Sequence, residues 1–583
     1  MNEASAESDS SGVVGAVPPA RIRARKRRTR LERAEQRTVV AAGLDNGHSQ
    51  RQMAAQLGVA RSTLQDGGVT AAVGQEPPAA LRAFAQTPEG VRWLQRQVLA
   101  AQFVITLLAG AGVRVVCQYL ELSGLSAFVG ASYGTQQRLT VALEERVVAV
   151  AAEQRRALAE GMPTRQITVG EDETFHPAPC LVGLALVSNF ILLEQYAADR
   201  SAATWTQALS VALEGLAVEV IQGTSDEAKG LLRHVQTALG AHHSPDLFHV
   251  QQEVVKATSL NLAREVKQAE AGVAQADAAW QAAREAQAAF ERQPRHPRGR
   301  PPAFAARTQA ALVASVQAER HRQQAVQQQT DARECVREIG ALYHPYDLQT
   351  GQAQSVERVA ERFHVGWARL QQIAETADLP QRARERLEKA QRVTTQLLAT
   401  IAFFFATLQM KVEALNLPPA LAAALREQLI PAIYLDRAAE RCTDAEQRHA
   451  LRALSAQLLA PLHQPQHPFQ ALSMAERQDL EQVAADCADL FQRSSSSVEG
   501  RNGQLSLHHH GHHRLTDRKL AALTALHNYF IRRPDGTTAA ERFFGRPPAS
   551  LFEQLLERMP LPPSPARRRP RTPKPPYLLP VAA

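Results

Sequence analysis

The stretch from Ile167 to Glu219 constrains the fold of this chain most, because β-branched residues gather there. Three short runs, ITVGEDETF, CLVGLALV and ILLEQYA, are separated by a few turn residues each, which predicts an antiparallel meander. Further elements are then expected in the order helix, strand, helix and short strand, at Ser201–Leu216, at Val218–Gly223, after Asp226 and at Asp246–Val250. The predicted order is three strands, helix, strand, helix, strand.

The rest of the chain has the composition of a helical protein. Hydrophobic residues make up 45% of the 583 residues but aromatic residues only 5%, whereas sheets usually recruit more aromatic and β-branched side chains. An all-β architecture is therefore excluded. The length predicts three or four folded regions rather than one core, and we expect a helix-dominated α+β fold.

Two long helical patterns follow the predicted sheet. Residues 251–290 and 305–339 are rich in Ala, Gln and Glu, and the basic loop RQPRHPRGRPP at 292–302 joins them, which predicts a coiled-coil-like hairpin. Helical patterning continues over 355–491, with breaks expected near Pro380, Pro418, Pro431 and 461–468. We therefore expect residues 256–489 to form an all-helical domain.

The N-terminal region carries the densest positive charge. After a polar leader at 1–20, which we expect to be disordered, the segment Arg21–Arg33 holds eight basic residues and one acidic residue. This density could neutralise several DNA phosphates, although a solvated charged arm would have the same composition. The basic residues that we expect to contact DNA are Arg25, Lys26, Arg27 and Arg28.

A helix-turn-helix is predicted directly after this arm, within residues 21–70. Ser49 and Gln52 have the spacing of a capping box, Gly58 would end that helix, and a further helix would begin near Arg61. An Ala-rich helical hairpin is the alternative interpretation. In a helix-turn-helix the second helix enters the major groove, and it would present Arg61, Ser62, Thr63 and Gln65.

Residues 80–165 are again helical in period, and a second, weaker helix-turn-helix is predicted within GVRVVCQYLELSGLSAFVGASYGTQQRL. The other end of the chain, 531–583, is expected to hold a helix and a Pro/Arg-rich tail that does not fold alone.

The apolar run Leu397–Leu408 is too short for the roughly 18 residues of a membrane span, and we expect a buried helix there. Five cysteines without a CxxC pair and no signal-peptide pattern predict a reducing cytoplasm.

Three acidic residues are expected to carry chemistry. They are Asp172 in GEDETFHP, Asp226 directly after a predicted strand, and Glu499 in SSSSVEGRNGQL. Carboxylates that converge repel one another and become useful mainly by binding a hard cation such as Mg²⁺ or Mn²⁺, which can then serve phosphodiester chemistry. Taken alone, each acid could equally be a helix cap or a first-turn residue that complements the helix dipole.

The strand order and the segments DETF, TSD, DLFH and SSSSVEGRN together resemble the DDE transposases of bacterial insertion sequences. The resemblance implies an RNase H-like catalytic core at 166–255 and 490–530, split by the helical domain. It also implies that Asp172, Asp226 and Glu499 are the catalytic and metal-binding acids. Asp246 and His249 in DLFH resemble the C/DxxH motif of Mutator-like branches and are expected to support the site from the last short strand.

Several assignments stay open at this point. Glu171 and Glu173 flank Asp172, so the register of the first acid is ambiguous, and Lys229 could contact a phosphate or simply be solvated. The histidine run at 508–513 could suggest a metal site, but consecutive residues rarely provide a defined coordination geometry. We expect instead that Arg501 and Asn502, with this run, form a DNA-facing helix surface.

The leading prediction is a bacterial DNA transposase that cleaves and joins double-stranded DNA at the ends of a mobile element. The net charge of +8 is compatible with this partner, and the enzyme is expected to be cytoplasmic, nucleoid-associated when bound, and to form a homo-oligomer on DNA without membrane contact. Two alternatives are a catalytically inactive or domesticated transposase-derived DNA-binding protein and a helical scaffold.

Overall fold

The computed structural model describes residues 39, 49–58, 77–175, 178–295, 299–300, 302–512, 515–560 and 562–565. These fall into two compact units, 1–87 and 88–583, which we describe separately. The predicted leader, the basic arm with Arg25, Lys26, Arg27 and Arg28, the helix of Arg61, Ser62, Thr63 and Gln65, and most of the C-terminal tail lie outside the described residues.

The first unit contains helices α2 (Gln50–Gln56) and α4 (Ala79–Phe84). The predicted capping box is confirmed: the Ser49 hydroxyl accepts a bond from the Gln52 backbone N–H at 3.3 Å, and the Gln52 side chain accepts one from the Ser49 N–H at 2.8 Å. Gly58 follows the helix with a φ of 59°, a left-handed conformation that glycine adopts easily. The helix-turn-helix itself remains a prediction.

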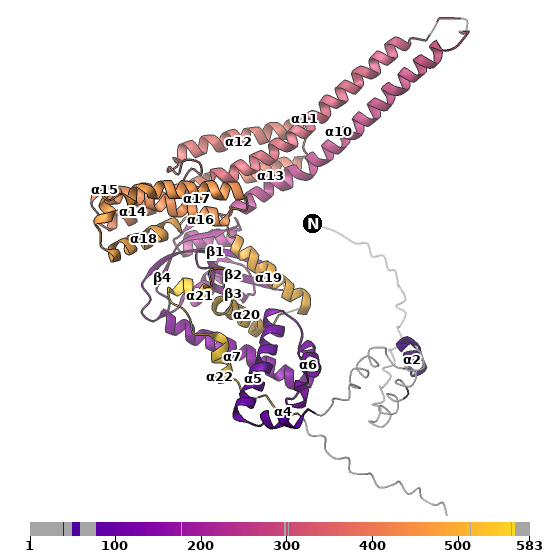
Figure 1. Ribbon diagram of the computed structural model, residues 1–583. Helices are drawn as coiled ribbons and strands as arrows, with labels where there is room; N and C mark the ends of the chain where they lie inside the picture. The colour runs from indigo at the N-terminus through magenta and orange to yellow at the C-terminus, as the bar shows by residue number, and fades with distance from the viewer. Residues whose placement is uncertain are drawn as a thin grey trace, which may run out of the picture. The chain divides into compact units, whose positions relative to one another are not determined.

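A mixed five-stranded sheet forms the centre of the second unit (Figure 1). Its spatial order is β3-β2-β1-β4-β5; the first three strands pair antiparallel, and β4 and β5 run parallel to β1. The predicted meander and the helix-dominated α+β class are therefore confirmed. The strands are β1 (Arg165–Phe175), β2 (Pro179–Ala185), β3 (Phe190–Tyr196), β4 (Val218–Ser225) and β5 (His242–Pro245).

Helices cover both faces of this sheet. Successive residues of a strand point to opposite faces, and β2 follows this rule. Leu181 packs with Trp205 of α8 (Ala202–Leu213), whereas Val182 packs with Val498 of α19 (Ser496–His512). The elements that complete the α8 side are α9 (Lys229–Arg233) and the π-helical turn η4 (His234–Ala238). Those on or near the other side are α19 (Ser496–His512), α20 (Asp517–Tyr529), α21 (Ala539–Phe544) and α22 (Leu551–Arg558).

The helices that precede the sheet confirm the helical pattern expected over 80–165. Helix α7 packs against α20 and α22 from the end of the chain, and the buried Phe103 ring contacts Phe530 and Phe552. The second helix-turn-helix stays a prediction. The elements are α5 (Pro88–Gln102), the π-helical turn η2 (Phe103–Leu108), α6 (Val113–Leu122), the 3-10 turn η3 (Leu125–Ala127) and α7 (Tyr133–Ala159).

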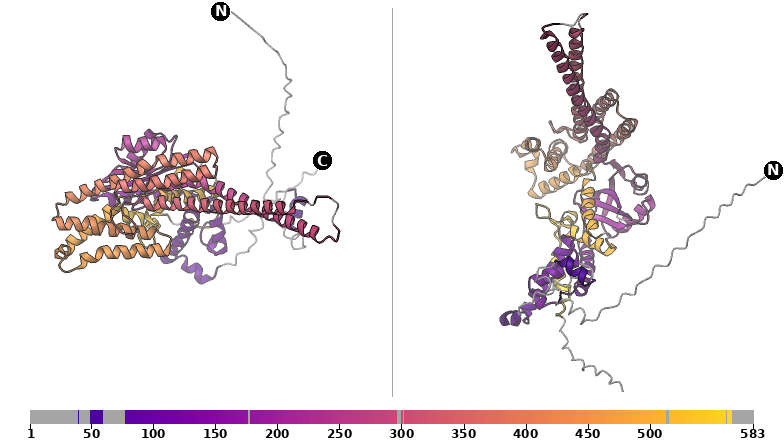
Figure 2. Two further views of the ribbon diagram at one scale, coloured as in Figure 1. Left: turned by 90° about the horizontal axis from the view of Figure 1, so that it is seen from above. Right: turned by 90° about the vertical axis from the view of Figure 1, so that its right-hand side faces the viewer.

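The predicted hairpin is confirmed as α10 (Leu247–Glu291) and α11 (Phe304–Leu342), which run side by side and project away from the sheet (Figures 1 and 2). The predicted strand at Asp246–Val250 is wrong, because α10 already begins at Leu247. The other helical elements before α19 are α12 (Val356–Thr376), α13 (Gln381–Arg392), α14 (Thr394–Ala414), α15 (Pro419–Ala424), η5 (Leu425–Leu429), α16 (Ile430–Arg441), α17 (Ala445–Leu459), η6 (Ala460–His463), η7 (Pro468–Ala471) and α18 (Met474–Ala488).

Proline marks most boundaries of this helical insertion as expected, but not all. Pro380 and Pro418 cap the starts of α13 and α15. The predicted break at Pro431 is wrong, because the π-helical turn η5 passes directly into α16, whose first turn contains the proline. The change from π-helical to α-helical geometry coincides there with the residue that has no backbone N–H to donate.

One helical stretch, Gln381–Ala414, is long and apolar enough to cross a membrane by length and composition alone, with a mean hydropathy of 1.4 in its most apolar window. Within it, Leu397, Ile401, Phe404 and Leu408 of α14 belong to the large buried cluster of the insertion. The predicted buried helix is confirmed there.

Candidate functional site

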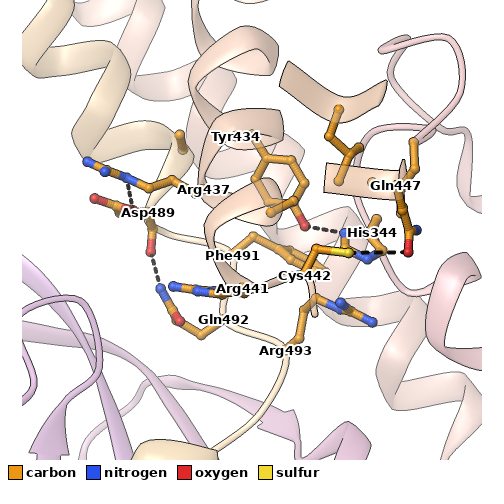
Figure 3. Close-up of a pocket in the computed structure, with 14 residues that line it drawn as sticks. His344, Tyr434, Arg437, Arg441, Cys442, Gln447, Asp489, Phe491, Gln492 and Arg493 are labelled. Carbon is orange, nitrogen blue, oxygen red and sulfur yellow. Dashed lines mark hydrogen bonds and ion pairs between the residues drawn. The ribbon is translucent and has the colours of Figure 1, made fainter. Parts of the chain in front are cut away.

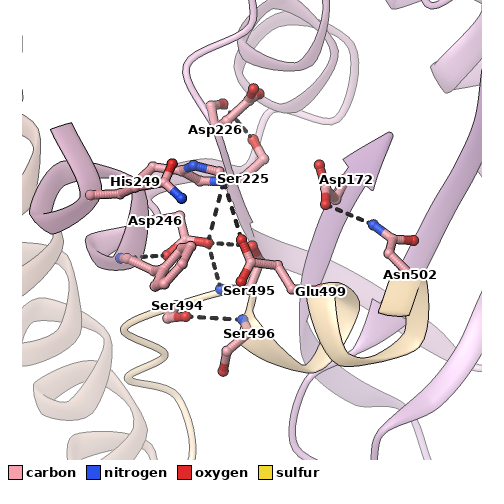
Figure 4. A network of polar contacts seen from close by, with 12 residues as sticks. Asp172, Ser225, Asp226, Asp246, His249, Ser494, Ser495, Ser496, Glu499 and Asn502 are labelled. Atoms are coloured by element: carbon pink, nitrogen blue, oxygen red, sulfur yellow. Dashed lines mark hydrogen bonds and ion pairs between the residues drawn. The ribbon is translucent and has the colours of Figure 1, made fainter. Parts of the chain in front are cut away.

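Three aspartates lie at one edge of the sheet, where the parallel strands β1, β4 and β5 point. In the β1–β4 pairing Gly170 lies opposite Thr224, so Asp172 and Asp226 both stand two residues beyond that pair. β5 runs parallel to β4 and ends one residue before Asp246. In open sheets with parallel strands, ligands bind outside the carboxyl ends of these strands, and this edge is therefore the candidate site (Figure 4).

The register of β1 decides which acid faces this edge. Glu171 is fully buried with its Oε1 atom 3.2 Å from Nε2 of His234 on η4, and Glu173 accepts a hydrogen bond of 3.1 Å from the Trp205 indole on α8. Asp172 points the other way, and its Oδ2 accepts a bond of 2.8 Å from the Asn502 amide on α19. Strand alternation thus assigns Asp172 to the α19 side and its two neighbours to the α8 side.

Asp226 follows the last residue of β4 in the short connection to α9. Its Oδ1 accepts the backbone N–H of Ala228 at 3.1 Å, and the hydroxyl of Ser225 lies 3.0 Å from Nε2 of buried His243. Burial lowers the pKa of His243 to about 4. Lys229 begins α9, and its contact with a phosphate stays a prediction.

Asp246 is a helix cap rather than the strand residue that we expected. Its Oδ1 accepts the Phe248 N–H at 2.8 Å at the start of α10, and its Oδ2 accepts the Ser495 N–H at 3.1 Å and the Ser495 hydroxyl. An aspartate preceding the first helical residue satisfies donors that the helix cannot. The carboxylate is almost fully buried, with 2% of the residue exposed.

His249 lies one turn into α10 and faces two acids. Its Nε2 is 4.0 Å from Oδ2 of Asp246 and 3.8 Å from Oε1 of Glu499. One ligand atom each from Asp246, His249 and Glu499 lie within 4.8 Å of one another, so these three side chains could hold a metal ion. Asp172 and Asp226 do not belong to this tight group.

Helix α19 brings Glu499 to the sheet edge, and a buried ion pair holds the helix in place. Arg501 is 5% exposed and makes two bonds of 2.7 Å to the carboxylate of Glu194 on β3. The expectation that Arg501 faces DNA is therefore wrong, because its guanidinium is used inside the protein. Close packing at Gly170 also holds α19 in place, because a Cβ at this position would lie 3.1 Å from the Val498 side chain.

Burial and neighbouring carboxylates disfavour the ionisation of two acids of the site, Asp172 and Glu499. Burial raises the pKa of Asp172 to about 6, and the negative charges of Asp226 and Glu499 add to the rise, against His249 and the Glu173 N–H. Burial and the charge of Asp246 likewise raise the pKa of Glu499. A cluster with this surplus of negative charge fits a hard divalent cation, which accepts carboxylate oxygens.

The described part of the histidine run, residues 508–512, forms the end of α19. His509 is 6% exposed and its Nε2 is 3.5 Å from the Tyr196 hydroxyl on β3. Among the described side chains, the one group of metal-ligand type contains no histidine from this run. The role of Ser495 could not be predicted from local sequence, because its partner Asp246 lies 249 positions away. Asn502 was expected on DNA but donates to Asp172.

A model of a family of unknown function (DUF6399) matches residues 425–571. The match begins at η5, includes Glu499, Arg501 and Asn502, and ends in the C-terminal tail. No curated protein matches the chain significantly. No solved structure does either.

Proposed function

We propose that this protein is a DDE-type DNA transposase that cleaves and joins DNA at the ends of a mobile element by divalent-metal-dependent phosphodiester chemistry. The strand order of the central sheet, a meander followed by two parallel strands, supports an RNase H-like core, and the helical elements between β5 and α19 correspond to the insertion expected of such an enzyme.

One observation carries the proposal. Glu499, which follows β5 only after the whole insertion, returns to the strand edge where Asp172 and Asp226 stand, and the negative charges of Asp226 and Glu499 both raise the pKa of Asp172. The Ser495–Asp246 bond fixes this return across 249 positions of sequence. Neither a helical scaffold nor a DNA-binding protein without catalytic activity requires acids from four elements to converge.

The donor set fits Mg²⁺ or Mn²⁺, with Asp172, Asp226 and Glu499 as proposed ligands and Asp246 and His249 beside them. A bound divalent cation would stabilise negative charge on the phosphodiester and favour the hydroxyl nucleophile. Asn502 orients Asp172 by donating to one carboxylate oxygen, and Ser495 fixes Asp246. His249 lies within 4.0 Å of two acids, and its imidazole nitrogen is placed to join the ligand set.

The test is a cleavage assay on duplex DNA carrying the flanks of the encoding gene, with Mg²⁺ or with EDTA. We expect cleavage with Mg²⁺ only, and a loss of about 10²–10³-fold in Glu499→Gln, because removal of one transition-state charge stabiliser costs on that order. Glu219→Gln is the matched control, since Glu219 is an exposed acid at the opposite end of β4. Full cleavage by Glu499→Gln, or cleavage in EDTA, would refute the proposal.

A second readout does not depend on DNA. Titration calorimetry with Mn²⁺ should show binding to the wild-type protein and to Glu219→Gln, and weaker binding to Asp172→Asn and Asp226→Asn. The proposed partners, double-stranded DNA and further copies of the chain on that DNA, are tested by the same variants in a gel-shift assay, where we expect binding to persist.

A further inference from the structure

The insertion contains a cavity of about 150 Å³ that is rich in arginine (Figure 3). Its walls come from α16, α17, the residue His344 after α11, and the segment 488–493 that leads out of α18. One water molecule needs roughly 10–15 Å³ of such a cavity, so the space is sufficient for a tetrahedral oxyanion and its waters.

The charges around this cavity do not balance. Arg437, Arg441 and Arg493 line it, and Asp489 is the one carboxylate in the lining. That acid lies 3.5 Å from Arg437, which is also 3.7 Å from Glu440. Among the described residues, no carboxylate lies within ion-pair distance of Arg441 or Arg493. The guanidinium groups of Arg441 and Arg493 therefore have no carboxylate partner in the described structure, and a bound anion could take that place.

Arg493 is the more demanding of the two. One Nη donates to the Gly340 carbonyl on α11, while its buried Nε has no hydrogen-bond partner in the described structure. Burial lowers the pKa of Arg493, and the nearby charge of Arg441 lowers it further. A guanidinium nitrogen that is buried without a hydrogen-bond partner or counter-charge is unfavourable, and a bound anion would supply the missing partner.

The remaining lining selects the size and kind of anion. His344 is buried with its Nδ1 atom 2.7 Å from the Tyr434 hydroxyl, and Leu348, Leu451 and Phe491 close the cavity with apolar surface. Guanidinium groups bind phosphoryl oxygens through paired N–H donors.

We propose that this cavity binds a phosphoryl group between Arg441 and Arg493. The group could belong to free phosphate, to a small phosphorylated metabolite, or to a DNA backbone phosphate that enters from the surface, and the chemistry of recognition is the same. This proposal does not depend on the proposed function.

The experiment measures thermal unfolding of the full chain in increasing inorganic phosphate, with NaCl keeping the ionic strength constant. We expect a saturable rise in Tm for the wild-type protein. Arg441→Gln should weaken the apparent phosphate affinity at least about tenfold, because one charged hydrogen-bond donor is lost. Arg441 is exposed at the residue level, so this variant should fold.

Arg452→Gln is the matched control, since Arg452 is an exposed arginine on the neighbouring helix α17 that does not line the cavity, and it should bind phosphate as the wild type does. Arg441→Lys, which keeps the charge but loses the paired donors, should fall between. A short duplex at equal phosphate concentration separates the sources: if the duplex alone raises Tm in an Arg441-dependent way, the phosphoryl group belongs to DNA. A shift that does not saturate, or that is equal in Arg441→Gln, would overturn the proposal.

Discussion

The acid cluster at the strand edge and the arginine cavity of the insertion are opposite in charge and are linked by one short segment. Asp489–Arg493 lines the cavity, and the chain then reaches Ser495 and Glu499 at the acid cluster. The acid cluster has more carboxylates than cations, and the cavity has more guanidinium groups than carboxylates. The acid cluster thus lacks positive counter-charge, and the arginine cavity lacks negative counter-charge.

The two sites also differ in how the chain builds them. The acid cluster takes one side chain from each of several elements, and sheet register sets their positions. The cavity takes its arginines from α16 and from the segment after α18, which both belong to the helical insertion. Strand ends thus position most of the acids, whereas all the arginines of the cavity come from helical structure and its connections. Four predictions test this contrast, from the largest expected effect to the smallest.

The largest effect should come from removing Asp246, the buried helix cap of the site, whose two carboxylate oxygens both accept hydrogen bonds. Asp246→Ala should lower the free energy of unfolding by about 3–4 kcal/mol, because buried donors of Phe248 and Ser495 lose their acceptor. Urea denaturation measures it. Asp444→Ala is the control, since Asp444 caps α17 at an exposed position and should cost about 1 kcal/mol. Equal losses would show that burial of Asp246 adds nothing.

The pH dependence of stability should have opposite signs at the two sites. In EDTA, the raised pKa of Asp172, about 6, gives stability that is present below about pH 4 and is lost as the pH rises through 6, by at most about 3 kcal/mol. Asp172→Asn should remove this loss. Unfolding curves from pH 4 to 8 measure it, and parallel curves for the two proteins would contradict the repulsion within the cluster.

At the arginine cavity, His344 should give the opposite dependence of stability on pH. Burial and the charges of Arg493 and Arg441 hold its pKa well below the usual value, so its stability is present above about pH 6.5 and is lost as the pH falls. His344→Gln should flatten the acidic side of the same unfolding curves. A wild-type slope in that variant would assign the acidic loss to other groups.

The third prediction compares how a variant of each site responds to Mg²⁺ and to phosphate. At about thirty times its dissociation constant, an ion that binds only the folded state adds about 2 kcal/mol to stability. Mg²⁺ should stabilise Arg441→Gln but not Glu499→Gln, and phosphate should stabilise Glu499→Gln but not Arg441→Gln. Thermal scans of both variants in both ions give the four values. Loss of both responses in one variant would mean that the sites are coupled rather than separate.

The smallest change concerns the packing that holds α19. Gly170→Ala would bring a Cβ within 2.4 Å of a Leu186 methyl and 3.1 Å of Val498, which should cost about 1–2 kcal/mol and reduce DNA cleavage by displacing Glu499. Gly500→Ala, with open space around it, should leave cleavage unchanged. Equal activity of the two variants would show that the distance between β1 and α19 does not matter.

Local patterns in the sequence were sufficient for much of the fold. The runs of β-branched residues predicted the meander, the heptad-like Ala and Gln segments predicted α10 and α11, and Ser49 with Gln52 predicted a cap. In each case the signal lies within a few residues. Asp246 misled us because LFHV reads as a strand, whereas the real strand, His242–Pro245, is polar and is buried by its neighbours, including Thr400 of α14.

The acids of the candidate site could be predicted from the sequence, but the residues that hold them in place could not. Motif resemblance pointed to Asp172, Asp226 and Glu499, whereas the partners Glu194 of Arg501 and Asp246 of Ser495 are fixed only by tertiary packing. A charged residue beside a motif looks exposed until its partner is known, and this is why Arg501 was expected on DNA. The arginine cavity has no local signature, because it depends on which residues around α16 remain unpaired.

The bond between Ser495 and Asp246 has a consequence for the order of synthesis. At about 5–20 residues per second, a ribosome needs roughly 12–50 seconds to add the residues that separate the two partners. During that time Asp172 and Asp226 have already emerged, but the chain holds no Glu499. If the protein cuts DNA as we propose, every nascent copy is inactive toward its own gene until the helical insertion has been synthesised. The insertion thus delays the start of DNA cleavage.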